Sequence, residues 1–154
     1  MNKTIFDIND LIKDCLKEIK FLFEERKVDV ETDFLPEKIE IKADLVEMKR
    51  AIINLLSNAI KFNKIGGNVK IKTIENNLMC KVLIEDTGIG MDEEKILHIF
   101  DKYVSYAKKF RRLGTGLGLY VTKKIINAHN GEIEVNSIKN KGSIFTITIP
   151  KDIN

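Results

Sequence analysis

The chain contains 154 residues, of which 44% are hydrophobic and 32% are charged. This length and balance suit one compact domain and exclude a disordered, collagen-like or disulfide-stapled chain. The 26 Lys and Arg residues against 23 Asp and Glu residues give a net charge of +3, which is too small to indicate nucleic-acid binding by itself. Cys15 and Cys80 lack metal-ligand spacing, and no apolar run is long enough to cross a membrane, so we expect a cytoplasmic domain with free thiols.

The first half of the chain is predicted to alternate between helices and strands. Apolar residues recur at intervals of three and four over residues 7–27, which predicts an amphipathic helix. Short strands are expected at 28–33 and 39–42. Asp44, with a Glu three residues later, has the spacing of a helix cap, so a long helix should run over 44–62.

The second half is predicted to contain hairpins, helices and a loop. Strands are expected at 69–75, 78–86, 133–137 and 144–149, and helices at 92–100 and 116–129. Residues 101–113 are polar and basic without a period, so we expect a mobile loop there. Strands outnumber helices and short turns join most of them. The predicted fold class is therefore α+β, a two-layer sandwich whose mixed, mostly antiparallel sheet is covered on one face by helices.

The predicted helix at 44–62 is apolar around most of its circumference. Its polar residues fall on one narrow stripe, made by Glu47, Arg50, Asn54, Asn58 and Lys61. The stripe faces either solvent or a cavity. Asn54 and Asn58 favour a cavity, because Asn is a poor helix former and an exposed position more often carries Glu, Lys or Gln. Two amide oxygens and an ammonium group near one point suit Mg²⁺ with its phosphates.

Asp86 ends the predicted strand at 78–86 in the phase that points to the apolar side. Thr87-Gly88-Ile89-Gly90 follows, and its glycines permit positive φ and close backbone approach. The segment is either an Asx turn with a solvated carboxylate or part of a ligand pocket. An ionised Asp only accepts hydrogen bonds, so in a pocket it would suit an exocyclic amine such as that of adenine.

A glycine-rich segment, Gly114-Thr115-Gly116-Leu117-Gly118-Leu119, opens the predicted helix at 116–129. Backbone N–H groups at a helix start bind anions well, and the alternative is a flexible hinge. The segment has neither the Rossmann glycine spacing nor a Walker A sequence. Basic residues at 108–112 precede it, either as a solvated run or as a loop that closes over phosphates.

In this order, these segments resemble the ATP-binding catalytic domain of bacterial sensor histidine kinases, a family grouped with DNA gyrase, mismatch-repair ATPases and ATP-driven chaperones. The resemblance covers about residues 7–150. Residues 54–62 resemble the N box, 86–90 the first glycine box, 99–103 the F box and 114–119 the second glycine box. It implies a Bergerat-type ATP-binding fold that forms a single domain over 1–154, with an ATP lid at about 101–113.

The resemblance also implies roles for individual residues. Asn58 would hold Mg²⁺ with Asn54 beside it, Lys61 would contact phosphate, and Asp86 would accept the adenine amine. Further nucleotide contacts are expected at Phe62, Gly88, Gly90, Lys102, Tyr103, Gly114, Thr115, Gly116, Leu117, Gly118 and Leu119, and by a looser match at Thr146, which would share the adenine water.

In the hydrolytic relatives, the position that resembles Asn54 carries a Glu that activates water. An amide cannot accept that proton at neutral pH, so we expect poor ATP hydrolysis and a γ-phosphoryl group preserved for transfer. Many family members carry an Arg near the position of Ser105, and Lys102 or a basic residue of 108–112 would have to replace it.

The family's phosphoacceptor motif, a His followed by an acidic residue, is absent, and we expect His98 and His129 to be structural. The expected partners are a separate histidine-containing dimerisation domain and, indirectly, a response regulator, with no nucleic acid. We expect the isolated domain to be monomeric and its parent protein to be free or anchored to the inner membrane. Two alternatives stay open: a serine kinase of the anti-sigma-factor type, and a non-catalytic nucleotide-sensing module.

Overall fold

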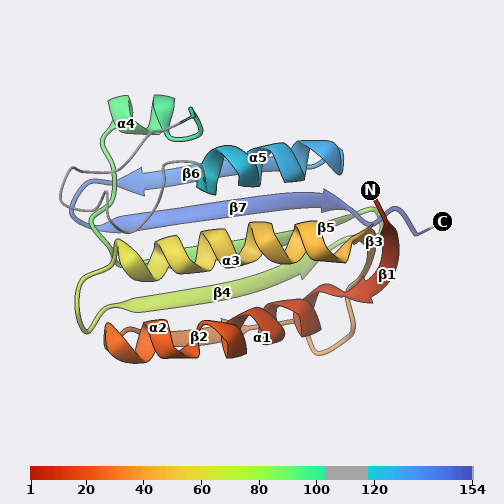
Figure 1. The fold of residues 1–154 in the computed structure, drawn as a ribbon, viewed down its shortest axis with the longest axis horizontal. Coiled ribbons are helices and arrows are strands. Elements are labelled where there is room, and N and C mark those ends of the chain that lie inside the picture. Colours follow the sequence, from red (N-terminus) through yellow and green to blue (C-terminus); the bar gives the residue numbers. More distant parts are fainter. Residues whose placement is uncertain (103–117, 154) are drawn as a thin grey trace.

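The computed structural model describes residues 1–102 and 118–153 (Figure 1). The elements in chain order are β1 (Lys3–Asp7), α1 (Ile8–Glu18), α2 (Lys20–Glu25), β2 (Asp29–Asp33), β3 (Glu40–Asp44), α3 (Leu45–Lys61), β4 (Asn68–Glu75), β5 (Met79–Asp86), α4 (Glu93–His98), α5 (Gly118–Ala128), β6 (Glu132–Ile138) and β7 (Gly142–Pro150). Helices α1, α3 and α5 lie side by side across one face of the large sheet. The predicted two-layer α+β sandwich is confirmed.

The large sheet has the strand order β2-β4-β5-β7-β6. Strands β2 and β4 are parallel, and the other neighbours are antiparallel, so the sheet is mixed and mostly antiparallel as predicted. The expected strands at 28–33 and 39–42 form but do not pair with each other. Instead, β3 pairs with β1 in a separate two-stranded sheet.

Two features at the N-terminus differ from the prediction. The single helix expected at 7–27 is broken at Ile19, whose φ of −103° and ψ of 12° end α1. The apolar period continues through the break because Ile19 itself is buried in the core. Strand β1 was not predicted, since its central residues Thr4 and Ile5 are both exposed and leave no alternation for a sequence pattern to show.

Helix α3 forms the centre of the core. The Asp44 carboxylate caps it by accepting a hydrogen bond from the Glu47 backbone N–H (3.1 Å), as the sequence predicts. The buried residues of the helix are Met48, Ala51, Ile52, Leu55, Leu56, Ala59 and Ile60. The first turn departs from the predicted apolar circumference, because Leu45 is 41% exposed and Val46 is 73% exposed.

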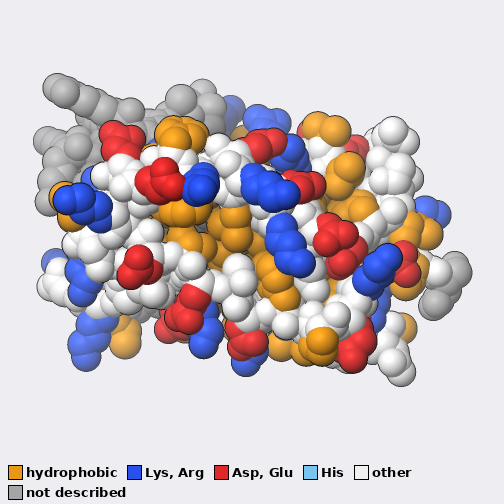
Figure 2. Space-filling model, turned by 90° about the horizontal axis from the view of Figure 1, so that it is seen from below, with side chains coloured by type: hydrophobic (Ala, Val, Ile, Leu, Met, Phe, Trp, Pro, Cys, Tyr) orange, Lys and Arg blue, Asp and Glu red, His pale blue; other side chains and the backbone are white. Residues whose placement is uncertain are grey.

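Acidic and basic side chains are interspersed over the surface on the side of α1, α2 and β2, with hydrophobic side chains between them (Figure 2). No helix in the described ranges is both long enough and apolar enough to pass through a bilayer.

Candidate functional site

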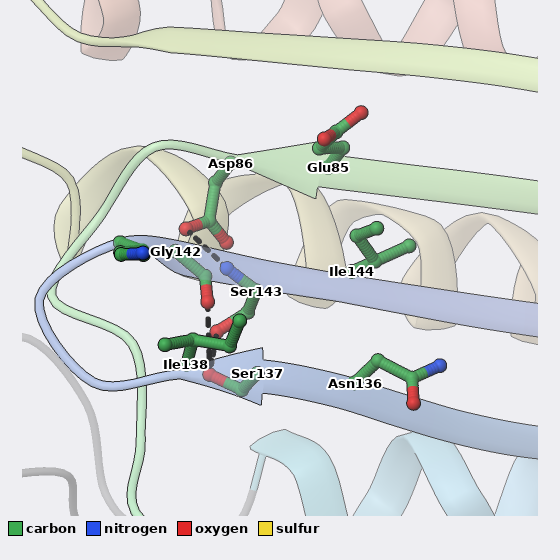
Figure 3. Close-up of a pocket in the computed structure, with 9 residues that line it drawn as sticks. Glu85, Asp86, Asn136, Ser137, Ile138, Gly142, Ser143 and Ile144 are labelled. Carbon is green, nitrogen blue, oxygen red and sulfur yellow. Dashed lines mark hydrogen bonds between the residues drawn. The ribbon is translucent and has the colours of Figure 1, made fainter.

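Asp86 is the last residue of β5 and pairs with Ser143 of β7. Its Oδ1 accepts hydrogen bonds from the backbone N–H groups of Gly88 (2.9 Å) and Ser143 (3.3 Å), the second of which is drawn in Figure 3. The predicted inward phase is confirmed by Cys80, Val82 and Ile84, which are fully buried along the same face of the strand. The strand was predicted to begin at Leu78, but β5 begins at Met79 and Leu78 is exposed.

Burial raises the pKa of the Asp86 carboxyl from 3.8 to about 6, and the nearby charge of Glu85 adds to the rise. The hydrogen bonds from Gly88 and Ser143 favour the charged form and limit the shift. At pH 7 the group is still mainly an acceptor-only carboxylate, but a partly desolvated one. A desolvated carboxylate binds a hydrogen-bond donor from a ligand more strongly than an exposed one does.

The turn after Asp86 packs directly on the C-terminal end of α3. The Ile89 backbone N–H donates to the carbonyl of Phe62 (3.1 Å). A Cβ atom at Gly88 would lie 2.5 Å from that same carbonyl oxygen, and one at Gly90, whose φ is +62°, would collide with the Ile138 carbonyl. Both glycines are therefore required by close backbone approach.

Asn58 and Asp86 line the same pocket. Its other residues are Ala59, Phe62, Ile89, Gly90, Ser143 and Phe145. The Asn58 side chain forms no hydrogen bond with another described residue, so its amide is available to a ligand. The free volume is about 10 Å³, which is close to the room that one water molecule needs.

Asn54 lies one helical turn before Asn58 and faces α5. Its Nδ2 donates to the Gly118 carbonyl (3.2 Å) and to Thr122 Oγ1 (3.3 Å). Leu119 is buried beside it at the start of α5. The predicted N box thus contacts the last part of the second glycine box.

Of the remaining predicted site residues, Lys61 and Phe62 are half-buried at the end of α3. The Lys102 ammonium lies 5.7 Å from the centre of the Tyr120 ring. Several predictions lie outside the described residues: Tyr103, Gly114, Thr115, Gly116, Leu117, Ser105 and the lid beyond residue 102.

The prediction for Thr146 is wrong. Thr146 pairs with Leu83 on the outer face of the sheet, whereas the alternating residues Ser143 and Phe145 face inward. Ser143 is the hydroxyl residue next to Asp86. The signal was present in the sequence, because the phase set by the apolar Phe145 already points Ser143 to the core.

A pair of serines, not predicted from the sequence, connects the strands at this end of the sheet (Figure 3). Ser137 Oγ lies 2.7 Å from Ser143 Oγ and 3.0 Å from the Gly142 carbonyl oxygen. Ser137 Oγ also accepts a hydrogen bond from the Met91 backbone N–H (2.8 Å). The serines therefore attach the segment after Gly90 to β6 and β7.

His129 is structural, as predicted. It is buried, its Nδ1 donates to the Ile125 carbonyl (2.8 Å), and its Nε2 accepts from the Asp44 backbone N–H (3.1 Å). His98 is exposed, with its Nδ1 2.8 Å from Asp101 Oδ2. A structural role for His98 stays a prediction.

The donor set near Asn58 fits a metal ion that arrives with phosphate groups. No group of three or more His, Cys, Asp or Glu side chains suited to a metal occurs in residues 1–102 and 118–153. The available ligand is a neutral amide oxygen. Mg²⁺ commonly takes one or two protein ligands and completes its shell with water and phosphate oxygens.

The family model described as "Histidine kinase-, DNA gyrase B-, and HSP90-like ATPase" matches residues 43–153, so the chain belongs to that family. The match includes the N-box segment, Asp86 and α5.

Within this ATPase family, the similar proteins are histidine kinases. The adaptive-response sensory kinase SasA of Microcystis aeruginosa is 33% identical over 151 residues, which cover 97% of this chain and 39% of SasA. The sensor histidine kinase YvrG of Bacillus subtilis is 38% identical over 116 residues, which cover 75% of this chain and 20% of YvrG. The chain thus spans less than half the length of these relatives.

Solved structures give the same class. The catalytic domain of the histidine kinase ThkA superposes with a TM-score of 0.87 at 29% identity, covering 98% of this chain and 97% of the ThkA domain. ThkA has also been solved in complex with the response regulator TrrA. This chain is therefore a histidine kinase ATPase domain.

Proposed function

We propose that this domain binds Mg-ATP and supplies the γ-phosphoryl group for a histidine on a separate dimerisation domain, within a two-component system. The observation that supports this proposal most directly is that Asn58 and Asp86, from distant parts of the sequence, line one pocket. The similarity to SasA, YvrG and ThkA supports the reaction class.

At the base end, Asp86 accepts a hydrogen bond from the exocyclic amine of adenine. Its Oδ1 is held by Gly88 and Ser143, and Oδ2 accepts no hydrogen bond from another described residue. Gly90 lets the backbone approach the base, and the Ser143 hydroxyl offers a further polar contact. Guanine presents a carbonyl oxygen where adenine has its amine, so a carboxylate disfavours it.

At the phosphate end, Asn58 holds the magnesium ion through its amide oxygen, with Asn54 beside it and Lys61 near the phosphates. The ion neutralises charge on the phosphates when it is bound. Asn54 cannot remove a proton from water, so this chain hydrolyses ATP slowly. Gly118 and Leu119, with Gly114, Thr115, Gly116 and Leu117, contact the phosphates, and Lys102 and Tyr103 begin the lid.

The acceptor histidine lies on a separate domain, and a response regulator receives the phosphoryl group next. ThkA, which was solved in complex with TrrA, supports a response regulator as a partner. The domain works in the cytoplasm. Neither a serine kinase nor a non-catalytic nucleotide sensor is supported by the relatives reported above.

The test is a calorimetric titration with ATP, in the presence of Mg²⁺ and after its removal with a chelator. GTP is the control ligand. We expect magnesium-enhanced binding of ATP and at least tenfold weaker binding of GTP. Equal affinities for ATP and GTP would contradict the role of Asp86, and binding unaffected by magnesium would contradict the role of Asn58.

A further inference from the structure

Thr122 lies in the second turn of α5, outside every motif considered above, and its side chain is completely buried (0% exposed). We propose that Thr122 is a positioning residue that fixes the side-chain amide of Asn54, so that the amide oxygen and not the nitrogen faces the magnesium site. The magnesium site itself rests on the proposed function. The amide orientation rests on hydrogen bonds within the protein alone.

Three polar groups meet at the contact between α3 and α5. Thr122 Oγ1 donates to the Gly118 carbonyl oxygen (2.8 Å). Asn54 Nδ2 donates to the same carbonyl oxygen (3.2 Å) and to Thr122 Oγ1 (3.3 Å). The three groups form a closed triangle beneath the start of α5.

The number of hydrogen atoms determines which way the amide points. A hydroxyl group has one hydrogen, and Thr122 uses it on the Gly118 carbonyl. Toward Asn54, Thr122 can therefore only accept, and the carbonyl can only accept as well. Two acceptors are satisfied by an NH₂ group. A rotated amide would place Oδ1 about where Nδ2 now lies, 3.2 Å from the Gly118 oxygen with no hydrogen between them.

The oxygen of the Asn54 amide is consequently left for a ligand. Asn54 Oδ1 accepts no hydrogen bond from another described residue. Asn54 and Asn58 are four residues apart on one helix, so their side chains share a face. An amide oxygen there can bind a water of the magnesium shell, whereas an NH₂ group would repel the cation.

The arrangement also favours an amide over a carboxylate at position 54. A carboxylate has no hydrogen to donate to the Gly118 carbonyl, and it would place two acceptors against each other in a half-buried contact. The Gly118 carbonyl therefore makes position 54 suit an Asn, the residue type expected to leave ATP unhydrolysed, and Thr122 is the second acceptor of that amide.

The test compares three variants of the whole chain. Thr122→Val keeps the shape but removes the hydroxyl, and Thr122→Ser restores it. Thr73→Val is the matched control: Thr73 is 1% exposed, and its hydroxyl donates to Asn9 Oδ1 (2.9 Å) away from the pocket. Each variant is titrated with ATP with and without Mg²⁺, and the ratio of the two dissociation constants is compared.

We expect Thr122→Val to reduce the magnesium enhancement about fivefold, the effect of one hydrogen bond. Thr122→Ser should restore the enhancement, and Thr73→Val should leave it unchanged. If Thr122→Val does not fold, Thr122→Ala replaces it. An unaltered enhancement in the hydroxyl-free variant would overturn the inference, while a wild-type chain without enhancement would overturn the proposed function.

A second readout needs neither nucleotide nor metal. The side-chain NH₂ resonances of Asn54 in a ¹H–¹⁵N spectrum report the hydrogen bonds of that amide. We expect them to shift in Thr122→Val and to return in Thr122→Ser. Resonances that stay in place when the hydroxyl is removed would overturn the positioning role, whatever the result with ATP.

Discussion

Replacing Asp86 by Asn should weaken ATP binding without lowering the stability of the folded protein at neutral pH. The amide of Asn is close in size to the carboxylate, and its oxygen can still accept the hydrogen bonds from Gly88 and Ser143. The other position becomes an NH₂ group, which donates where the adenine amine also donates. We expect Asp86→Asn to weaken ATP binding by about 1–3 kcal/mol, roughly 5- to 150-fold.

The same change should not destabilise the protein at neutral pH. Burial raises the pKa of Asp86 from 3.8 to about 6, so the native state binds this proton more tightly than the unfolded state does. Ionisation between about pH 4 and pH 6 therefore costs the native state up to about 3 kcal/mol, a cost that persists above pH 6. The stability of the wild-type chain relative to Asp86→Asn should fall as the pH rises through this interval.

Two measurements on the same samples check this reasoning. Calorimetry gives the ATP affinity, and urea unfolding at about pH 4 and pH 7 gives the stability of each protein. Affinity that is unchanged in a folded Asp86→Asn variant would refute the adenine role. A variant that loses as much stability at pH 7 as at pH 4 would refute the assigned cost of burying the charge.

Four other predictions test separate parts of the domain. Asn58→Ala should abolish the magnesium dependence of ATP binding in calorimetry, and a titration still enhanced by Mg²⁺ would contradict this. Ser143→Ala should weaken ATP binding by about 1 kcal/mol while the backbone bond to Asp86 remains, and an unchanged affinity would count against Ser143. Leu55→Ala should lower the free energy of unfolding, measured in urea, by about 2–5 kcal/mol, because Leu55 is buried in the core. A smaller loss would show that neighbouring side chains repack into the cavity left by the substitution. The isolated chain should not label itself from ATP carrying radioactive γ-phosphate, and acid-labile label on His98 or His129 would refute that.

Most of the fold was predictable because the apolar periods are set by a single core. The long run of α3 and the alternation in β4, β5 and β7 each report one buried face. The pairing of strands was not predictable in the same way. Strand β2 reaches β4 in parallel and β3 pairs with β1, and these partners depend on contacts between distant residues that no local pattern contains.

In the candidate site, too, the residues that a local pattern marks were predictable, and those defined by contacts between distant residues were not. Asn58 and Asp86 were predicted because a polar residue in a buried phase is locally conspicuous. Ser137 was missed since its role comes from Met91 and Ser143, which approach it only in the folded sheet. The expectation for Thr146 came from the resemblance alone, and it conflicts with the strand phase that the buried Phe145 sets.

Helix α3 joins the two ends of the site mechanically. At its C-terminal end, the Phe62 carbonyl accepts a hydrogen bond from the turn that follows Asp86, and about two turns further back Asn54 donates to the start of α5. Both contacts use the same rigid, buried helix, so the base end and the phosphate end cannot shift independently of it. A substitution that tilts α3 should therefore weaken ATP and free phosphate ligands together, whereas Asp86→Asn should weaken only ligands that contain adenine. The affinities for ATP and for inorganic triphosphate are measured in both kinds of variant. If an α3 variant weakens only one of the two ligands, the base end and the phosphate end are separate sites that adjoin and not one site built on a single helix.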